Sequence, residues 1–166
     1  MENFNWGDKA VALRRVFWLT DYIERVYGSW VGENIVLISE LFYRGSMHLK
    51  LTDEPWATLT NLETIDGIIG EYGYSTLEPI IEALDFHATY PNLKYFECIN
   101  KNRRWAVINP DNFNFAINAP NLVATYNLFN GCKQEEIDMS GCVTPKLADV
   151  TGMFINCSNL TIVKLP

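Results

Sequence analysis

Two segments of the chain have the apolar spacing of amphipathic helices. Residues 8–28 place apolar side chains at near-helical intervals, with Asp8 in the position of an N-cap and Gly28 where a glycine ends a helix. Residues 76–88 repeat this spacing behind Thr76, which is a suitable capping residue. The pattern therefore predicts helices over 8–28 and 76–88.

Two other segments have features of strands. Residues 47–51 alternate apolar and polar side chains, which predicts a strand. Residues 34–43 allow two interpretations. Asn34 as a cap, with apolar side chains at positions 35, 38, 41 and 42, favours a short helix, whereas the β-branched residues at the start of the segment favour a strand.

From residue 61 onward the chain contains an internal repeat. An Asn-Leu pair (Lys-Leu in the fourth copy) is followed by a large apolar residue six positions after the leucine, and successive full copies lie 31, 29 and 25 residues apart. The copies are Leu62 with Ile68, Leu93 with Ile99, Leu122 with Leu128, Leu147 with Met153, and an opening Asn159-Leu160. Because a coil this short cannot bury an apolar side alone, the repeat predicts a solenoid of stacked coils.

The last two full copies align at an offset of 25 residues. The matching pairs are Pro120 with Pro145, Leu122 with Leu147, Phe129 with Phe154, and Cys132 with Cys157. Stacked coils would therefore place leucine above leucine and cysteine above cysteine, at the spacing of about 4.7–4.9 Å of a parallel sheet. None of the four cysteines lies in a C-x-x-C pair, so we expect buried or half-buried thiols rather than zinc ligands or disulfides.

The C-terminal 50 or so residues resemble a known family. Residues 137–140, Ile-Asp-Met-Ser, and residues 153–161, Met-Phe-Ile-Asn-Cys-Ser-Asn-Leu-Thr, are similar to the bacterial leucine-rich repeats of the BspA type. Residues 150–153 lack the first methionine of the family pattern, and residues 133–136 replace its usual Ser-x-Leu-Thr. The resemblance implies a binding or structural module of the kind found in bacterial surface, phage-borne and protist proteins, and it implies no catalytic residues.

These patterns together predict an α/β fold, a leucine-rich-repeat solenoid with short parallel strands. Residues 1–50 show no repeat and are expected to form an N-terminal helical cap, while residues 51–166 form the coils, the last of them incomplete. An uncovered last coil would leave backbone groups and apolar side chains available for docking. We therefore expect either that the chain continues in a longer protein, which we favour, or that this coil allows self-association.

Composition and charge exclude several classes of protein. The 166 residues are 48% hydrophobic, which is ample for a core and excludes global disorder. A net charge of −7 disfavours general binding to nucleic acid. The chain shows neither a secretory signal nor an apolar run long enough to span a membrane, which favours a cytoplasmic or virion-associated location over the cell surface.

One local cluster departs from the acidic average. Lys101, Arg103, Arg104 and Trp105 combine positive charge with a tryptophan, and Arg and Trp are frequent anchors of protein interfaces. These four residues are our candidate protein-binding site. The alternative is an ordinary loop between two strands, with Trp105 packed inward.

The predicted function is a non-enzymatic protein-binding or structural module, with no cofactor and no metal. The only histidines, His48 and His87, have no evident catalytic partners in the sequence. The alternative is a small acidic inhibitor that blocks a basic groove of a nucleic-acid enzyme, which would gather its acidic side chains on one face. An enzyme would instead require a deep pocket that holds one of the two histidines beside a carboxylate.

Overall fold

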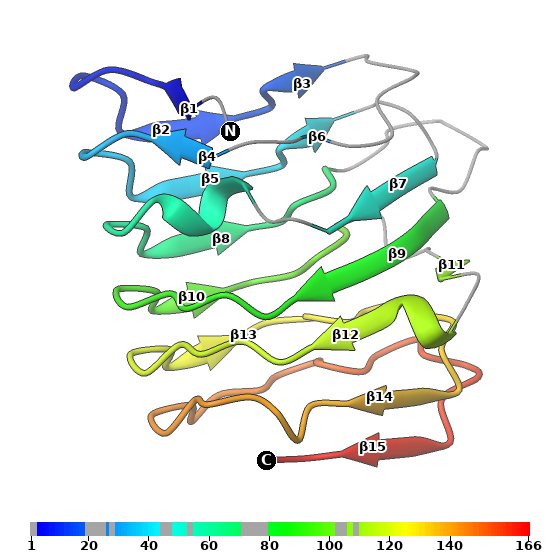
Figure 1. Ribbon diagram of the computed structural model, residues 1–166. Helices are drawn as coiled ribbons and strands as arrows, with labels where there is room; N and C mark the ends of the chain where they lie inside the picture. Colours follow the sequence, from blue (N-terminus) through cyan, green and yellow to red (C-terminus); the bar gives the residue numbers. More distant parts are fainter. Residues whose placement is uncertain are drawn as a thin grey trace.

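The computed structural model shows a β-solenoid, in which the chain winds as a stack of coils and short strands of successive coils lie above one another (Figure 1). The structure describes residues 3–18, 26, 29–43, 48–52, 55–70, 80–101, 106–107 and 110–166. Every strand pair in these ranges is parallel. The predicted solenoid of stacked parallel strands is therefore confirmed.

One row of strands runs through almost the whole stack, and we call its outer surface the first face. The row consists of β2 (Ala12–Arg14), β5 (Leu37–Ser39), β8 (Thr64–Asp66), β10 (Tyr95–Phe96) and β13 (Ala124–Thr125), and it ends on a bridge to Asp149. The register pairs Ala12, Leu37, Thr64, Tyr95, Ala124 and Asp149 in succession, at steps of 25, 27, 31, 29 and 25 residues. Each step is one coil.

The remaining strands form two further rows. The second row contains β3 (Phe17–Trp18) and β6 (Phe42–Tyr43) and continues through bridges at Ile69 and Asn100. The rest of the strands are β1 (Asn3–Asn5), β4 (Ser29–Val31), β7 (His48–Leu51), β9 (Ile80–Phe86), β11 (Ala106–Val107), β12 (Phe113–Phe115), β14 (Glu136–Asp138) and β15 (Ile162–Lys164). We call the row that contains β7, β9 and β12 the third row. Two short 3-10 turns, η1 (Pro55–Thr58) and η2 (Pro110–Asn112), are the helical elements of the described residues.

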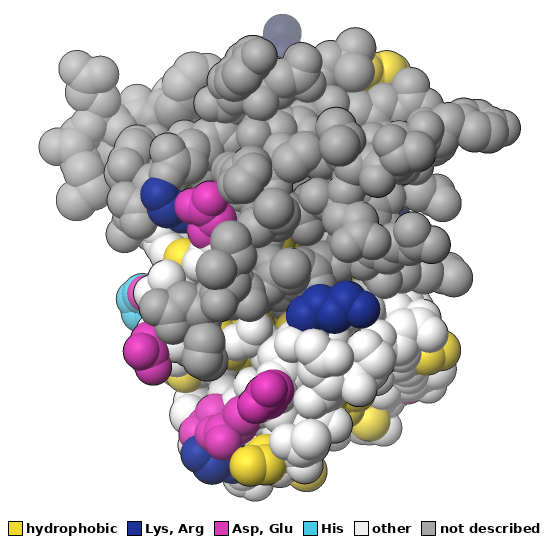
Figure 2. All heavy atoms as spheres, turned by 90° about the vertical axis from the view of Figure 1, so that its right-hand side faces the viewer, with side chains coloured by type: hydrophobic (Ala, Val, Ile, Leu, Met, Phe, Trp, Pro, Cys, Tyr) yellow, Lys and Arg dark blue, Asp and Glu magenta, His cyan; other side chains and the backbone are white. Residues whose placement is uncertain are grey.

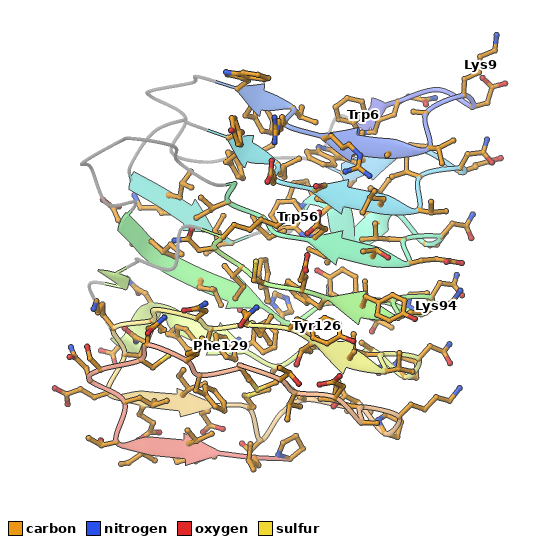
Figure 3. The ribbon with its side chains drawn as sticks, turned by 180° about the vertical axis from the view of Figure 1, so that it is seen from behind. Trp6, Lys9, Trp56, Lys94, Tyr126 and Phe129 are labelled. Atoms are coloured by element: carbon orange, nitrogen blue, oxygen red, sulfur yellow. The ribbon has the colours of Figure 1, made fainter. Side chains whose placement is uncertain are left out.

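Aromatic rings form a continuous column through the interior of the stack. Successive ring centroids lie 5.1–6.1 Å apart along Trp6, Trp30, Trp56, Phe86, Phe115, Phe129 and Phe154. The labelled rings of Trp6, Trp56 and Phe129 mark its course from one end of the molecule toward the other (Figure 3). Since almost every neighbouring pair comes from successive coils and most contacts are edge-to-face, the column joins the coils through favourable aromatic geometry.

The Asn-Leu repeat has a direct structural explanation. The first three leucines of the repeat are buried, and each asparagine of an Asn-Leu pair donates its side-chain amide to a backbone carbonyl of the previous coil. The bonds run from Asn61 to Glu33 (2.5 Å), from Asn92 to Thr60 (2.7 Å), from Asn121 to Pro91 (2.8 Å) and from Asn159 to Lys133 (3.3 Å). Leu62, Leu93 and Leu122 are at most 1% exposed, whereas Leu147 and Leu160 near the last coil are half-buried. The repeat therefore marks a corner that links consecutive coils.

The predicted helix over 8–28 is wrong. β2 and β3 occupy part of it, and residues 19–25, 27 and 28 lie outside the described residues. The apolar spacing belongs to the coil: Ala10 and Val16 are six residues apart, as in the later copies, and both pack on the core. Arg15 between them has a φ of 49°, which no right-handed helix allows.

The predicted helix over 76–88 is also wrong, because β9 occupies 80–86 and residues 76–79 lie outside the described residues. The buried side chains Ile81 and Leu84 are three residues apart, which imitates a helix. The spacing comes from a register shift opposite Leu49 and Lys50, where Glu82 is the extra residue. A β-bulge of this kind breaks the alternation of a strand.

The α/β class and the N-terminal helical cap over residues 1–50 are therefore corrected to an all-β solenoid in the described residues. Residues 34–43 form strands β5 and β6, and the predicted strand at 47–51 is confirmed as β7, with Met47 outside the described residues. Asn34-Ile35 opens one more copy of the repeat, with Leu41 six residues after the isoleucine, and Asn34 donates to the carbonyl of Asp8.

The leucine-rich-repeat assignment does not fit this architecture either. A leucine-rich repeat carries one strand and a helix or 3-10 turn per coil, whereas these coils carry strands in three rows and almost no helix. No helix in the described ranges is long and apolar enough to cross a membrane.

Truncation of the aromatic column should destabilise the whole stack. We expect Phe115→Ala to lower the free energy of unfolding by about 3–5 kcal/mol, because Phe115 is 1% exposed and contacts rings on both neighbouring coils. Tyr95→Ala is the control, since Tyr95 is 43% exposed and its loss should change stability by at most about 0.5 kcal/mol. Urea unfolding monitored by circular dichroism measures both, and equal losses would contradict the role of the column.

Candidate functional site

The strongest concentration of interacting charges lies at the corner between the first and second rows of strands. The chain turns there through a residue with positive φ in most coils: Arg15 (49°), Glu40 (49°), Gly67 (77°), Asn127 (57°) and Gly152 (68°). Only glycine adopts this left-handed conformation without cost. The turn directs the last residue of each first-row strand and the corner residue itself toward the same edge.

The register of the first row stacks three polar residues at this edge. Ser39 pairs with Asp66, and Glu97 directly follows the residue paired with Ile65, so the three side chains come from successive coils. The Ser39 hydroxyl donates to Asp66 Oδ2 at 2.8 Å. The carboxyl groups of Asp66 and Glu97 interact with each other, which favours one proton shared between them.

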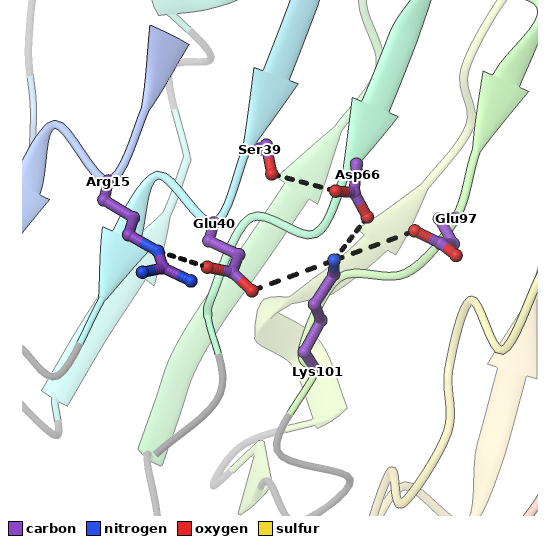
Figure 4. Close-up of polar contacts among 6 residues, drawn as sticks. All are labelled: Arg15, Ser39, Glu40, Asp66, Glu97 and Lys101. Carbon is purple, nitrogen blue, oxygen red and sulfur yellow. Dashed lines mark hydrogen bonds and ion pairs between the residues drawn. The ribbon is translucent and has the colours of Figure 1, made fainter. Parts of the chain in front are cut away.

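Lys101 folds back over these carboxylates from the coil of Glu97. Its ammonium group forms an ion pair with Asp66 and lies 3.8 Å from both Glu40 Oε1 and Glu97 Oε2 (Figure 4). Its aliphatic chain covers Gly67, where a Cβ atom would lie 3.0 Å from Lys101 Cγ and Cε. Lys101 therefore joins three coils through one side chain.

Arg15 extends the network to the preceding coil. Its Nε atom lies 2.6 Å from Glu40 Oε2, and its guanidinium carbon lies 4.0 Å from the ring centroid of Tyr43 and 5.7 Å from that of Trp18. We call the six residues Arg15, Ser39, Glu40, Asp66, Glu97 and Lys101 the corner cluster (Figure 4). Stacking on Tyr43 fixes the guanidinium plane beside Glu40.

The two carboxyl groups of the pair have opposite pKa shifts. Partial burial alone would raise the pKa of Asp66, but hydrogen bonds with Glu97, Lys101 and Ser39 hold that pKa below its ordinary value. The hydrogen bond with Asp66, followed by burial, raises the pKa of Glu97 to about 7. The pair thus holds one proton between its two carboxyl groups below about pH 7 and releases it as the pH rises above this value.

Partial burial would lower the pKa of Lys101, but the hydrogen bond and the charge of Asp66, together with Glu97, raise it instead. Lys101 therefore stays positively charged beside the pair. The cluster can bind coils together and can release or take up a proton near pH 7, and Lys101 occupies the position that a cationic ligand would need.

The structure changes the role of the predicted binding residues. Lys101 belongs to the corner cluster, with its side chain 25% exposed and surrounded by carboxylates, and does not act as a free positive charge. Arg103, Arg104 and Trp105 lie outside the described residues. The four residues as one interface stay a prediction.

The candidates for catalysis are placed as follows. His87 Nδ1 lies 3.1 Å from Asp85 Oδ1, on the surface, with 61% of the histidine side chain exposed. His48 lies in β7, and its side chain is outside the described residues. Of the acidic residues near the C-terminal end, Glu136 and Asp138 pair with Lys164, at 2.5 and 3.4 Å.

The cysteines behave as the repeat predicts. Cys98, Cys132 and Cys142 are buried and Cys157 is half-buried, and all four are free thiols. Burial raises the pKa of Cys132 to about 12, and Cys157 Sγ donates to the carbonyl of Phe129 at 3.0 Å. Among the described residues, no group of three or more His, Cys, Asp or Glu side chains is placed to hold a metal ion.

Asp66, Glu97 and Glu40 were not predicted from the sequence as site residues, although the repeat contains a spacing that indicates two of them. Counting four residues from the leucine or isoleucine of each copy leads to Ser39, Asp66 and Glu97 in turn. Alignment of the N-terminal copy that begins at Asn34 would have placed them in one column. No spacing rule indicates that Lys101 covers them, because it belongs to a different part of the coil.

Comparison with known proteins identifies no relative of this chain. No protein-family model, no curated protein and no solved structure matches it.

Removal of the shared proton should change how stability depends on pH. Because the pKa of Glu97 in the folded state is about 7 and its ordinary value is 4.5, the folded protein binds more protons than the unfolded protein between these values. Stability should therefore fall as pH rises from about 4.5 to 7. The lowered pKa of Asp66 acts only at lower pH, below its ordinary value of 3.8.

Melting temperatures of wild type and Glu97→Gln at several pH values between 5 and 8 test this expectation. The glutamine variant should lose the downward slope, because it keeps the hydrogen bond without a proton to release. Glu63→Gln, which removes an exposed first-face carboxylate 2.9 Å from Lys94, is the control and should keep the wild-type slope. An unchanged slope in Glu97→Gln would show that Glu97 does not titrate in this range.

A methyl group at Gly67 should displace Lys101. Gly67→Ala should lower the free energy of unfolding by about 1–2 kcal/mol, because alanine adopts the left-handed conformation at this cost. The added methyl group also forces Lys101 away from the carboxylates. Gly7→Ala is a matched control, because its φ is 75° and no heavy atom lies within 4 Å of the added methyl. Gly67→Ala should therefore be the more destabilised of the two in urea unfolding. Equal losses would mean that Lys101 adds nothing measurable.

Proposed function

We propose that this chain is a non-enzymatic protein-binding or structural module whose contact surface is the first face of the solenoid. The observation that carries the proposal is the pair of tyrosines, Tyr95 and Tyr126, which come from successive coils of the first row. Tyr95 is 43% exposed and Val123 beside this row is 36% exposed. Tyrosine is enriched in protein interfaces, where it contributes large contact area at low entropic cost.

The tyrosines lie among charges of both signs. Tyr126 interacts with the carboxylate of Asp149 on the next coil, and Lys94 beside Tyr95 pairs with Glu63 at 2.9 Å. Figure 3 shows Tyr126 beside the first row of strands and Lys94 at the edge of the stack where these strands begin. A surface that is already ordered loses little entropy on binding.

The distribution of acidic side chains supports a module of this kind over an acidic inhibitor. Many of the described acids have a basic partner close by, usually on another coil, and these are Glu40, Glu63, Asp66, Glu82, Glu97, Glu136 and Asp138. Figure 2 shows acidic and basic side chains interspersed along one side of the molecule. An inhibitor of a basic groove needs unpaired acids gathered on one face.

The proposed role needs no cofactor. Self-association through the last coil, where all three residues of β15 are exposed, is a further part of the proposal.

An affinity experiment with the whole chain as bait tests the proposed surface. We expect a specific protein of the source cells to be enriched by wild type and by Asn114→Ala, which alters another row of strands. Tyr95→Glu should reduce its recovery at least tenfold, because it places a charge in the middle of the contact. Recovery that does not depend on Tyr95, or no enriched protein at all, would contradict binding through the first face.

A further inference from the structure

A depression on the outer side of the third row of strands is separate from the corner cluster. Its volume is about 450 Å³, and its polar lining consists of Lys50, Thr52, Asp85, Asp111, Asn112 and Asn114. Thr52 directly follows β7, and the other residues come from β7, β9, the turn η2 and β12. The three strands belong to adjacent coils. The volume is within the range of small-molecule sites.

The fold builds this depression through the bulge in β9. The register shift between Leu49 and Lys50 inserts Glu82 as an unpaired residue and bends the strand. The ammonium nitrogen of Lys50 lies 3.5 Å from Glu82 Oε2. The side-chain amide of Asn112 donates to the backbone carbonyl of Glu82 at 3.4 Å. The bulge thus gives the ammonium group and one amide of the lining a common anchor.

A second set of contacts orders the opposite part of the lining. Asn114 Nδ2 donates to Asp85 Oδ1 at 2.7 Å, and the same oxygen lies 3.1 Å from His87 Nδ1. The Asp85 carboxylate is therefore held by two groups, the His87 ring from its own coil and the Asn114 amide from the next coil. Fixed donors and acceptors of this kind give orientation to a bound ligand.

The chemistry of the lining excludes several ligand classes. The described lining has no aromatic ring, and its apolar members are Ala83 and the fully buried Leu84, so it offers little surface to a lipid or a nucleobase. Asp85 and Asp111 outnumber Lys50, which disfavours phosphates and other anions. The described residues hold no cluster of metal ligands.

The hydrogen-bond donors and acceptors of the lining match those of a ligand with hydroxyl groups. Carboxylates accept hydrogen bonds, the ammonium group donates them, and amides and the threonine hydroxyl do both. A hydroxyl both donates and accepts, so a neutral ligand with several hydroxyls can use all of these groups. Three strands at the parallel-sheet spacing extend over about 10 Å, which accommodates two linked sugar rings.

We infer that the depression between β7, β9 and β12 is a carbohydrate-binding site that takes a neutral disaccharide unit. Asp85 and Asn114 form one side of the site, Lys50 and Asn112 the other. The site goes beyond the proposed protein-binding function, because it uses another row of strands and none of the first-face residues.

Titration of the isotope-labelled whole chain with neutral disaccharides, followed by NMR, tests the inference. The probes are maltose, cellobiose, lactose and diacetylchitobiose, each up to ~10 mM, which would fill about nine-tenths of a site with a millimolar Kd. At least one should give saturable shifts in β7, β9 and β12. Glucose 6-phosphate and spermidine, as an anion and a polyamine, should bind more weakly.

Three variants place the bound sugar. Asp85→Asn and Asn114→Ala should each weaken binding at least tenfold, and Lys94→Ala on the first face should leave it unchanged. Circular dichroism establishes that each variant is folded, and Asp111→Asn replaces either one that is not. The inference is overturned if none of the four disaccharides binds, if binding is equal in all variants, or if either charged probe binds more tightly. None of these outcomes affects the test at Tyr95.

Discussion

The aromatic column is the interaction on which the rest of this structure depends. A single coil of 25–31 residues encloses too little volume to bury its own apolar side chains, so each coil is stable only against a neighbour. The large rings from Trp6 to Phe154 fill the space between successive coils. Backbone hydrogen bonds set the spacing between paired strands, and the rings fill the interior that this spacing encloses.

Polar side chains, like the aromatic rings, join one coil to the next, because most of their interactions run between coils rather than within one coil. The asparagines at one corner and the corner cluster at another each join a coil to the next. Exposed ion pairs add little to stability. Their effect is to fix which residue lies above which. Lys101 beside the stacked acids Asp66 and Glu97 offsets part of the repulsion between them.

The sequence predicted the solenoid because one feature of the repeat is independent of coil length. The pair Leu93 and Ile99 keeps its spacing of six residues, since both point into the core on either side of a corner. The N-terminal copies were missed because Lys9-Ala10 and Asn34-Ile35 stand where the later copies have Asn-Leu. The strand β9 was missed because its bulge imitates the spacing of a helix. The corner cluster could be predicted only as far as the column of Ser39, Asp66 and Glu97.

From the amino-acid order alone follow the stacking of coils, the buried leucines and the inert character of the cysteines, because each depends on a pattern that recurs locally along the chain. The all-β class, the pairing of Lys101 with three carboxylates and the depression beside the bulge were decided only by the tertiary structure. The reason is that coils of unequal length bring residues together across the stack. Which side chains then meet depends on the register between coils, and no local spacing contains that information.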